Sequence, residues 1–506
     1  MAYLLWSWWW AATLSAAAMA FWLLQTIRKH NLPPGPRGLP ILGYFPFLGT
    51  HLHKTFTELA QVHGPIYKLW LGQKIYVVIS SPLLAKQIRD NDVAFANRDP
   101  VIASTVLTYG ANDIAFSPYG PEWKKLRKVF VRELLSNSRL DASYVVRKQE
   151  VGKALADVYW KKRGEALDFG QLVFTTISNT ILSMLWGSTI HGKEGEKFFS
   201  RVRELSSEFV ALQGAANVSD YIPGLARFDL QGIERKSRRV LEVLDGIFCT
   251  AIDQRRKKLV EKAEKETTKD FLQILLELKS RGDDASSITE NQLKGILMDA
   301  IIGGTDTTST TIEWTMAELM QHPDAMQKVI KELDEVVGRS YAVEEFHLPK
   351  LCYLDAAIKE TFRLHPTVPI LVPRSARGDC DLGGYTIPKG ATVVINAFAI
   401  QRDPYLWDSP LEFRPERFLD EKASKFDYLG TSSQYLPFGT GRRVCPGLPM
   451  AERMLKHFLA SLLHTFEWRL AYGTQIDLTD KFGIVVKLEK PLVLVPTPRL
   501  ANPELY

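Results

Sequence analysis

Residues 437–447 read PFGTGRRVCPG and place one cysteine, Cys445, among three glycines, two arginines and two prolines. A thiol binds a metal only as the thiolate, so its surroundings decide whether it can act as a ligand. Arg442 and Arg443 supply positive charge, and the glycines let backbone amides turn toward the sulfur. The helical segment PMAERMLKHFLASLL follows, and the amino end of a helix carries a positive partial charge. These features predict a lowered pKa for the Cys445 thiol and a metal-thiolate role, in preference to an inert buried cysteine.

The spacing F-x-x-G-x-R-x-C-x-G, from Phe438 through Gly447, resembles the haem-thiolate signature of the cytochrome P-450 monooxygenases. Four other segments resemble motifs of that family and occur in the family's order. They are WKKLR (123–127), a W-x-x-x-R that meets a haem propionate; GGTDTT (303–308), the oxygen-activation segment; KETFR (359–363), the E-x-x-R pair; and FRPERF (413–418), which completes an ion-pair network. Each motif is weak alone, but the five in order are specific, and the resemblance covers about residues 32–500.

The resemblance implies a mainly α-helical cytochrome P-450 fold with a small β region, and haem b bound through Cys445 as the axial ligand of the iron. Phe438, Gly439 and Gly304 are expected beside the haem. Its propionates need cations or hydrogen-bond donors. The candidates for that task are Trp123, Arg127, Arg374 and Arg443, with Arg98 as a further candidate.

Two other groups of residues take roles by the same resemblance. Glu360, Arg363 and Arg417 are expected to form a buried ion network that holds the cysteine loop. Asp306 and Thr307 are expected to be catalytic, because a carboxylate and a hydroxyl can pass protons through water.

The central helix is predicted from the residues themselves. Thr289 and Gln292 form a capping box, and the helical pattern continues from there to the His-Pro pair at 322–323. About 32 residues at about 1.5 Å each give a length of about 48 Å. In its middle, Gly303, Gly304 and several hydroxyl side chains are poor helix formers. The glycines predict open space for a bulky neighbour, although such a pair also occurs in ordinary helix packing.

The first 27 residues, MAYLLWSWWWAATLSAAAMAFWLLQTI, contain no charged side chain. An apolar run of about 20 residues is long enough to cross a membrane. Arg28 and Lys29 follow this run, which favours a cytosolic carboxyl side, whereas a cleaved signal peptide carries its basic residues first. We expect a transmembrane anchor at 1–27, a basic and proline-rich strap at 28–40, and one haem-thiolate catalytic domain at 41–506. The expected location is the endoplasmic reticulum membrane, with a single span and a cytosolic catalytic domain.

The composition excludes several classes of protein. Apolar residues make up 46% and charged residues 24% of the 506 residues, which is typical of globular proteins. The four cysteines are far apart, so a disulfide framework or a structural zinc site is not expected. A net charge of +6 without an arginine-rich tract gives no support for nucleic-acid binding. Short strand-like runs at 66–80 and 391–398 add a small sheet to an otherwise helical pattern.

Electrons must come from outside the chain, because the sequence contains no flavin or nicotinamide fold. We expect an acidic NADPH-cytochrome reductase to bind a basic face behind the cysteine. The cations expected on that face are Lys124, Lys125, Lys128, Arg132, Arg453 and Lys456.

The substrate follows only from resemblance to the plant microsomal, A-type branch of the family. We expect a hydrophobic plant metabolite, in the first place a sesquiterpene-type terpenoid and alternatively a flavonoid or phenolic. The segments expected to line its site are mainly apolar: Val101–Ile114, Phe209–Val218, Ile296–Ile302, Thr367–Leu371 and Phe482–Val485. Two rivals are an oxygen-independent haem-thiolate isomerase or dehydratase and a non-enzymatic haem sensor, and neither has a use for the Asp306-Thr307 pair.

Overall fold

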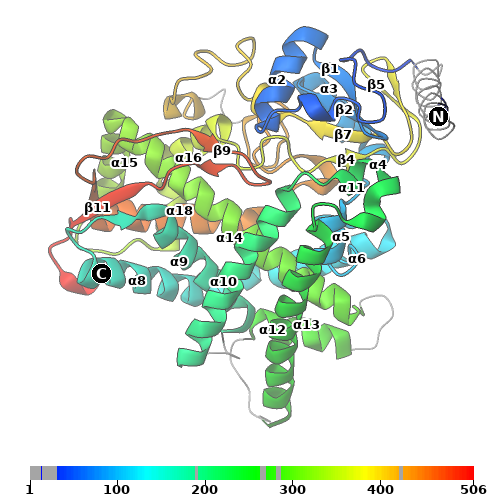
Figure 1. The fold of residues 1–506 in the computed structure, drawn as a ribbon. Helices are drawn as coiled ribbons and strands as arrows, with labels where there is room; N and C mark the ends of the chain where they lie inside the picture. The colour runs from blue at the N-terminus through cyan, green and yellow to red at the C-terminus, as the bar shows by residue number, and fades with distance from the viewer. Residues whose placement is uncertain are drawn as a thin grey trace, which may run out of the picture. The chain divides into compact units, whose positions relative to one another are not determined.

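The computed structural model in Figure 1 describes residues 31–187, 192–261, 269–280, 287–420 and 425–506, together with Trp9 and Thr13. The chain divides into two compact units, each made from three stretches. The first contains Met1–Asp99, Ala216–Gln231 and Ile370–Ile400, and the second contains Pro100–Ala215, Gly232–Pro369 and Gln401–Tyr506. The boundaries expected near residues 27 and 40 stay predictions.

The first unit is built on a four-stranded sheet in the order β1-β2-β7-β4. Strands β1 (Ile66–Leu71) and β2 (Lys74–Ile79) form an antiparallel hairpin, and β7 (Thr392–Ile395) runs parallel to β2. Strand β4 (Arg374–Ser375) is antiparallel to β7. The strands predicted at 66–80 are therefore confirmed. The strand predicted at 391–398 is confirmed only at 392–395, because Ala397 and Phe398 belong to the following helix, α17 (Ala397–Ile400). The unit also contains α2 (Leu52–His63), α3 (Pro82–Asp90), α4 (Asp92–Phe95), α11 (Val218–Tyr221), α17 (Ala397–Ile400) and the pair β5 (Cys380–Leu382) and β6 (Tyr385–Ile387).

The described part of the strap is hydrogen-bonded to β1. Lys68 donates its backbone amide to the carbonyl oxygen of Pro34 at 2.7 Å and its Nζ to that of Pro33 at 2.5 Å. A Cβ at Gly35 would lie 1.9 Å from the Lys68 carbonyl oxygen, so this close approach requires glycine. The prolines bring carbonyl acceptors without amide donors that would need partners.

The second unit is centred on α14 (Glu290–Gln321). The helix begins at the predicted capping box, in which Thr289 and Gln292 each accept the other's backbone amide with the side chain. Helices α9 (Phe169–Trp186), α15 (Pro323–Val336), α16 (Cys352–Leu364) and α18 (Leu448–Thr465) pack against α14. The unit also contains α5 (Ile102–Leu107), α6 (Pro121–Val129), α7 (Asn137–Ala142), α8 (Tyr144–Lys161), α10 (Gly192–Gly214), α12 (Ile233–Glu261), α13 (Phe271–Ser280), the sheet β3-β11-β8 (Leu167–Asp168, Val493–Pro498, Phe466–Leu470) and the pair β9 (Asp480–Lys481) and β10 (Lys487–Leu488).

Hydroxyl side chains in the middle of α14 bond to the preceding helical turn. Thr307 donates to the Gly303 carbonyl oxygen at 2.6 Å, and Thr311 donates to that of Thr307 at 2.9 Å. Ser309 donates to the carbonyl oxygen of Thr305 at 3.0 Å. These bonds satisfy polar groups on a helix that is buried on most sides, and α14 continues through them without a break.

The predicted membrane anchor at 1–27 lies outside the described residues, apart from Trp9 and Thr13. In the part of the chain that the structure describes, no helix combines the length and apolar character needed to cross a membrane.

Candidate functional site

Cys445 lies in a tight loop immediately before α18. Its amide donates to the carbonyl oxygen of Phe438 at 3.0 Å, which closes the loop. Gly439 and Gly441 have φ values of +76° and +66°, in the left-handed region that favours glycine. The Cys445 residue is exposed to solvent. Two glycines of the signature therefore shape the loop that presents the sulfur.

The pKa of the Cys445 thiol differs from the prediction. Although the residue is exposed, the protein atoms packed around its sulfur desolvate a thiolate, and this effect raises the pKa. Amide hydrogen bonds from Gly447 and Leu448 and the charge of Arg127 act in the opposite direction without cancelling the rise. The predicted lowering is therefore wrong for the free thiol. A metal ion bound to the sulfur would still remove its proton.

Arg442 and Arg443, which were expected to lower that pKa, make other contacts. The guanidinium carbon of Arg442 lies 6.0 Å from the centre of the Tyr119 ring. Arg443 is buried and donates to the carbonyl oxygens of Ile114 and Ser117 at 3.1 and 2.7 Å. The Arg443 guanidinium therefore binds carbonyl oxygens of the 114–117 segment.

Three of the predicted propionate partners come together around one indole ring. The guanidinium carbons of Arg443 and Arg127 lie 4.3 and 5.6 Å from the centre of the Trp123 ring. Arg127 donates to the carbonyl oxygen of Val444 at 2.8 Å, so it also touches the cysteine loop. The Trp123 Nε1–H donates to the Ile114 carbonyl oxygen at 3.0 Å, a bond within the protein that the sequence did not indicate. Two cations therefore lie beside the loop, held by an aromatic ring.

Arg374 and Arg98 belong to the first unit. The Nη1 atom of Arg374 lies 3.0 Å from Asp92 Oδ1, and burial lowers the pKa of Arg374 while Asp92 opposes that effect. Arg98 donates to the carbonyl oxygens of Val372 and Pro373 at 2.5 and 2.7 Å. The structure thus gives both arginines protein partners, and their role toward a propionate stays a prediction.

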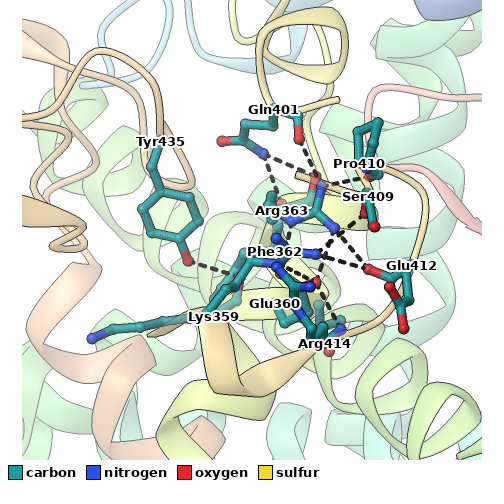
Figure 2. Close-up of polar contacts among 12 residues, drawn as sticks. Lys359, Glu360, Phe362, Arg363, Gln401, Ser409, Pro410, Glu412, Arg414 and Tyr435 are labelled. Carbon is teal, nitrogen blue, oxygen red and sulfur yellow. Dashed lines mark hydrogen bonds and ion pairs between the residues drawn. The ribbon is translucent and has the colours of Figure 1, made fainter. Parts of the chain in front are cut away.

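Glu360 is the centre of a buried ion network on α16, shown in Figure 2. Arg363 donates to Glu360 Oε2 and Oε1 at 2.7 and 2.9 Å, and Arg417 donates to Oε1 at 2.8 Å. The backbone amide of Arg414 donates to the same oxygen at 2.9 Å. Arg363 also donates to the carbonyl oxygens of Gln401, Pro410 and Glu412. The three residues that the family resemblance grouped are therefore brought together.

This network continues to the start of the cysteine loop. Gln401 donates its side-chain amide to the Phe362 carbonyl oxygen at 2.8 Å, and its Oε1 accepts the backbone amide of Leu436 at 2.7 Å. The Tyr435 hydroxyl donates to the Lys359 carbonyl oxygen at 3.1 Å (Figure 2). Helix α16 is thus tied to Tyr435 and Leu436, the residues just before the 437–447 loop.

Gly303 and Gly304, in the middle of α14, have different surroundings. A Cβ at Gly303 would meet nothing within 4 Å, so open space lies beside this residue. A Cβ at Gly304 would lie 3.0 Å from Cδ1 of Ile181, a residue of α9. Gly303 is thus the glycine beside the open space, and the expectation that Gly304 borders the haem stays a prediction.

Asp306 is buried and has a partner that the sequence did not suggest. Its Oδ1 lies 2.5 Å from Nζ of Lys487 in β10, while Oδ2 is buried with no hydrogen-bond partner among the described residues. The only sequence signal for Lys487 is a single cation within the apolar run FGIVVKL. The pair places a cation beside the carboxylate expected to move protons.

Comparison with known proteins identifies the family. The family model described as Cytochrome P450 matches residues 33–495. A flavonoid 3′-monooxygenase of Oryza sativa subsp. japonica is 37% identical over 484 residues, which cover 94% of this chain and 92% of the relative. A 3,9-dihydroxypterocarpan 6A-monooxygenase of Glycine max is 37% identical over 97% of both chains. A zebra fish cytochrome P-450 solved with progesterone superimposes with a TM-score of 0.76 and 29% identity, covering 88% of this chain and 99% of that structure.

The chain belongs to the cytochrome P-450 family and is a monooxygenase, an oxidoreductase related to plant enzymes. The predicted helix-rich fold with a small β region is confirmed.

The described residues fit haem b. The Cys445 residue is exposed, and a thiolate is a ligand that haem iron accepts. Open space lies beside Gly303, and Arg127 and Arg443 are cations close to the cysteine loop. The Phe438 ring packs against Phe362 at 5.2 Å between ring centres, which fixes it at the start of the loop. A bound haem would supply the activation of O₂ for oxygen transfer.

Proposed function

We propose that this monooxygenase inserts one oxygen atom from O₂ into a flavonoid or a closely related polyphenol. The observation that carries the proposal is the similarity over almost the whole chain to relatives named for flavonoid and pterocarpan oxidation. These relatives favour the flavonoid alternative over the terpenoid substrate that the sequence placed first. Fold alone does not fix a substrate, so the test must use compounds of both classes.

The proposed roles fall mainly to residues of the second unit. Cys445 would hold the haem iron, and Arg127, Arg443 and Trp123 would border the propionates, with Arg374 and Arg98 from the first unit as further candidates. Asp306 and Thr307 would move protons, since Asp306 has a buried oxygen that no described residue hydrogen-bonds and Thr307 carries a hydroxyl one position further along the helix. A proton pathway of this kind supports oxygenase chemistry over an isomerase, a dehydratase or a haem sensor.

Electrons would come from NADPH through a separate reductase, at the cytosolic face of the endoplasmic reticulum membrane. Of the six cations expected to bind it, Lys124, Lys128 and Arg132 are exposed on or next to α6. Arg453 instead pairs with Asp141 at 2.6 Å, and Lys456 pairs with Asp355 at 2.7 Å. The exposed three are therefore the stronger candidates. If turnover is unchanged when the salt concentration rises and also in the Lys124→Glu, Lys128→Glu double variant, this face does not bind the reductase.

The test is reconstitution in membranes with a plant reductase and NADPH. The panel contains flavonoids and sesquiterpenes. Each flavonoid that is accepted should give a product that carries one oxygen atom from labelled O₂. Oxygenated sesquiterpenes without oxygenated flavonoids would overturn the proposed substrate class. Product formed without uptake of O₂ or oxidation of NADPH would overturn the monooxygenase reaction itself.

A further inference from the structure

The backbone beside Lys487 is attached to α14 by an indole ring. The Trp314 Nε1–H donates to the carbonyl oxygen of Val486 at 3.1 Å, and Val486 directly precedes Lys487 in the chain. Trp314 is buried, so this bond is shielded from competing water. Trp314 lies about two turns after Asp306, which is about 12 Å along the helix axis. One helix therefore binds both the Val486 carbonyl, through Trp314, and the Lys487 ammonium, through Asp306.

The strand that carries Lys487 has little support of its own. Strands β9 and β10 contain two residues each and form a two-stranded sheet. An isolated two-stranded ribbon is marginally stable in water, so bonds outside the ribbon must fix its position. The amide of Val486 supplies one such bond, because it donates to the Thr367 carbonyl oxygen at 2.9 Å. The bond from Trp314 supplies another and ties the ribbon to α14 itself.

The Trp314 ring is itself held in one orientation. It stacks on the His365 ring, with 4.0 Å between the ring centres and 9° between the ring planes. His365 Nε2 lies 2.5 Å from Oε1 of Glu318, which is four residues after Trp314 and therefore one turn further along α14. The stacked ring and the carboxyl group behind it fix the direction in which the indole N–H points.

The position of Lys487 matters because its charge reaches a second carboxyl group. The charges of Lys487 and Asp306 both act on Glu313, a residue of α14 whose pKa burial raises to about 7. The Lys487 ammonium also lies 5.9 Å from the centre of the Phe174 ring. Because the attraction between charges depends on their separation, a shift of the ribbon would change how the ammonium is shared between Asp306 and Glu313.

We infer that Trp314 is a positioning residue for proton delivery, because it sets where Lys487 meets Asp306; this inference rests on the proposed proton-transfer role of Asp306. The Asp306 carboxylate is buried and Lys487 is partly exposed, so their pair connects the carboxylate with solvent. Without the indole N–H the Val486 carbonyl is released, and the supply of protons to Asp306 slows. O₂, NADPH and one proton then give hydrogen peroxide and NADP⁺ in place of water and an oxygenated product.

The experiment measures the hydrogen peroxide formed per oxygenated product by the reconstituted enzyme, with any substrate that the parent accepts. Trp314→Phe keeps a ring against His365 but removes the N–H donor. It should raise this ratio by about fivefold, which is the change in population that one lost hydrogen bond of about 1 kcal/mol corresponds to. The dissociation constant of the substrate, measured from the absorption spectrum, should stay unchanged.

Trp468→Phe is the matched control, because Trp468 is also buried and donates its Nε1–H to a carbonyl oxygen, that of Leu462, at 3.0 Å. It should leave the ratio unchanged, and an equal rise in both variants would overturn the inference. If Trp314→Phe does not bind haem, β-(3-benzothienyl)alanine at position 314 takes its place in the same measurements, since it keeps the shape of the indole and lacks the N–H.

Lys487→Met decides whether Trp314 acts through the ion pair. This variant should itself raise the ratio, and adding Trp314→Phe to it should raise the ratio no further. An equal effect of Trp314→Phe with and without Lys487 would show that Trp314 acts by another route, and the inference would be wrong. If Asp306→Asn raises the ratio and Trp314→Phe does not, the inference fails while the proposed role of Asp306 stands. If Asp306→Asn couples normally, that proposed role fails and the inference falls with it.

Discussion

Lys487 Nζ lies 2.5 Å from Oδ1 of Asp306, although the two residues are 181 positions apart in the chain. The Asp306 side chain is 5% exposed and that of Lys487 is 39% exposed, so the carboxylate is buried and depends on a cation that reaches solvent. The acid expected to move protons is therefore held by β10, a strand near the end of the chain.

Lys487→Met should lower the free energy of unfolding by about 1–3 kcal/mol, because it leaves the buried Asp306 carboxylate without its cation. The loss of stability should fall in the lower part of this range, because Lys487 is partly exposed and water screens its ion pair with Asp306. Denaturant unfolding of both single variants and of the double variant with Asp306→Asn measures the coupling. Additive effects in this cycle would show that the pair contributes nothing to stability.

Thr307→Ala should uncouple the reaction. The variant should still bind haem and substrate and consume NADPH, but proton delivery should fail, so hydrogen peroxide should rise as product falls. The control is Thr305→Ala, since the Thr305 hydroxyl is buried with no hydrogen-bond partner among the described residues and lies two positions away on the helix. Normal coupling in the Thr307 variant on a good substrate would exclude this hydroxyl from the proton pathway.

Glu360→Gln should destabilise the second unit by about 3–5 kcal/mol, because it leaves the buried guanidinium groups of Arg363 and Arg417 without a carboxylate. Unfolding in denaturant measures this loss. Glu467→Gln is the control, since Glu467 pairs with Arg469 on the surface and its removal should change stability by about 0.5 kcal/mol or less. Equal effects of the two variants would mean that the network is not what stabilises this region.

Cys445→Ser should abolish the red-shifted carbon monoxide absorption band of the reduced, haem-loaded enzyme, because the band reports thiolate ligation. Cys352→Ala, at the exposed start of α16, should keep the band. Spectra of the two variants in the presence of carbon monoxide decide the ligand, and a band retained by Cys445→Ser would refute the assignment.

Asp113 should make stability depend on pH. Burial raises the pKa of Asp113 from 3.8 to about 7, so the folded protein binds this proton more tightly than the unfolded chain. Its contribution to stability is therefore fully present below about pH 4 and is lost as the pH rises toward about 7. Asp113→Asn should gain stability relative to the parent across that interval, as measured by unfolding at a series of pH values. A constant difference between the two proteins would contradict the raised pKa.

Short-range geometry was predictable from the sequence. Glu360 and Arg363 are three positions apart on a helix, so their pairing needs only helical periodicity, and the spacing of Gly439, Gly441 and Cys445 is enough to indicate a tight loop. The capping box at Thr289 is equally local. In each case the residues that interact are close in the chain, and backbone geometry alone brings them together.

Long-range packing was not predictable in this way. The sequence shows Arg442 and Arg443 beside Cys445 but does not show that Arg443 turns to the Ile114 carbonyl oxygen or that surrounding atoms desolvate the sulfur. Desolvation depends on every neighbour in three dimensions, and it reverses the expected direction of the thiol pKa. The partner of Asp306 was missed for the same reason, since no local pattern connects it with β10.

The central sheet of the first unit has a consequence for how the protein is made. Tyr76 in β2 pairs with Thr392 in β7, so one edge of the β1–β2 hairpin stays without its partner until most of the chain has left the ribosome. An unpaired edge invites association with other chains, and pairing between such distant segments is slow. During synthesis this hairpin is therefore a point of risk for aggregation, and chaperones or slower translation should raise the yield of soluble enzyme more than changes at the catalytic residues do.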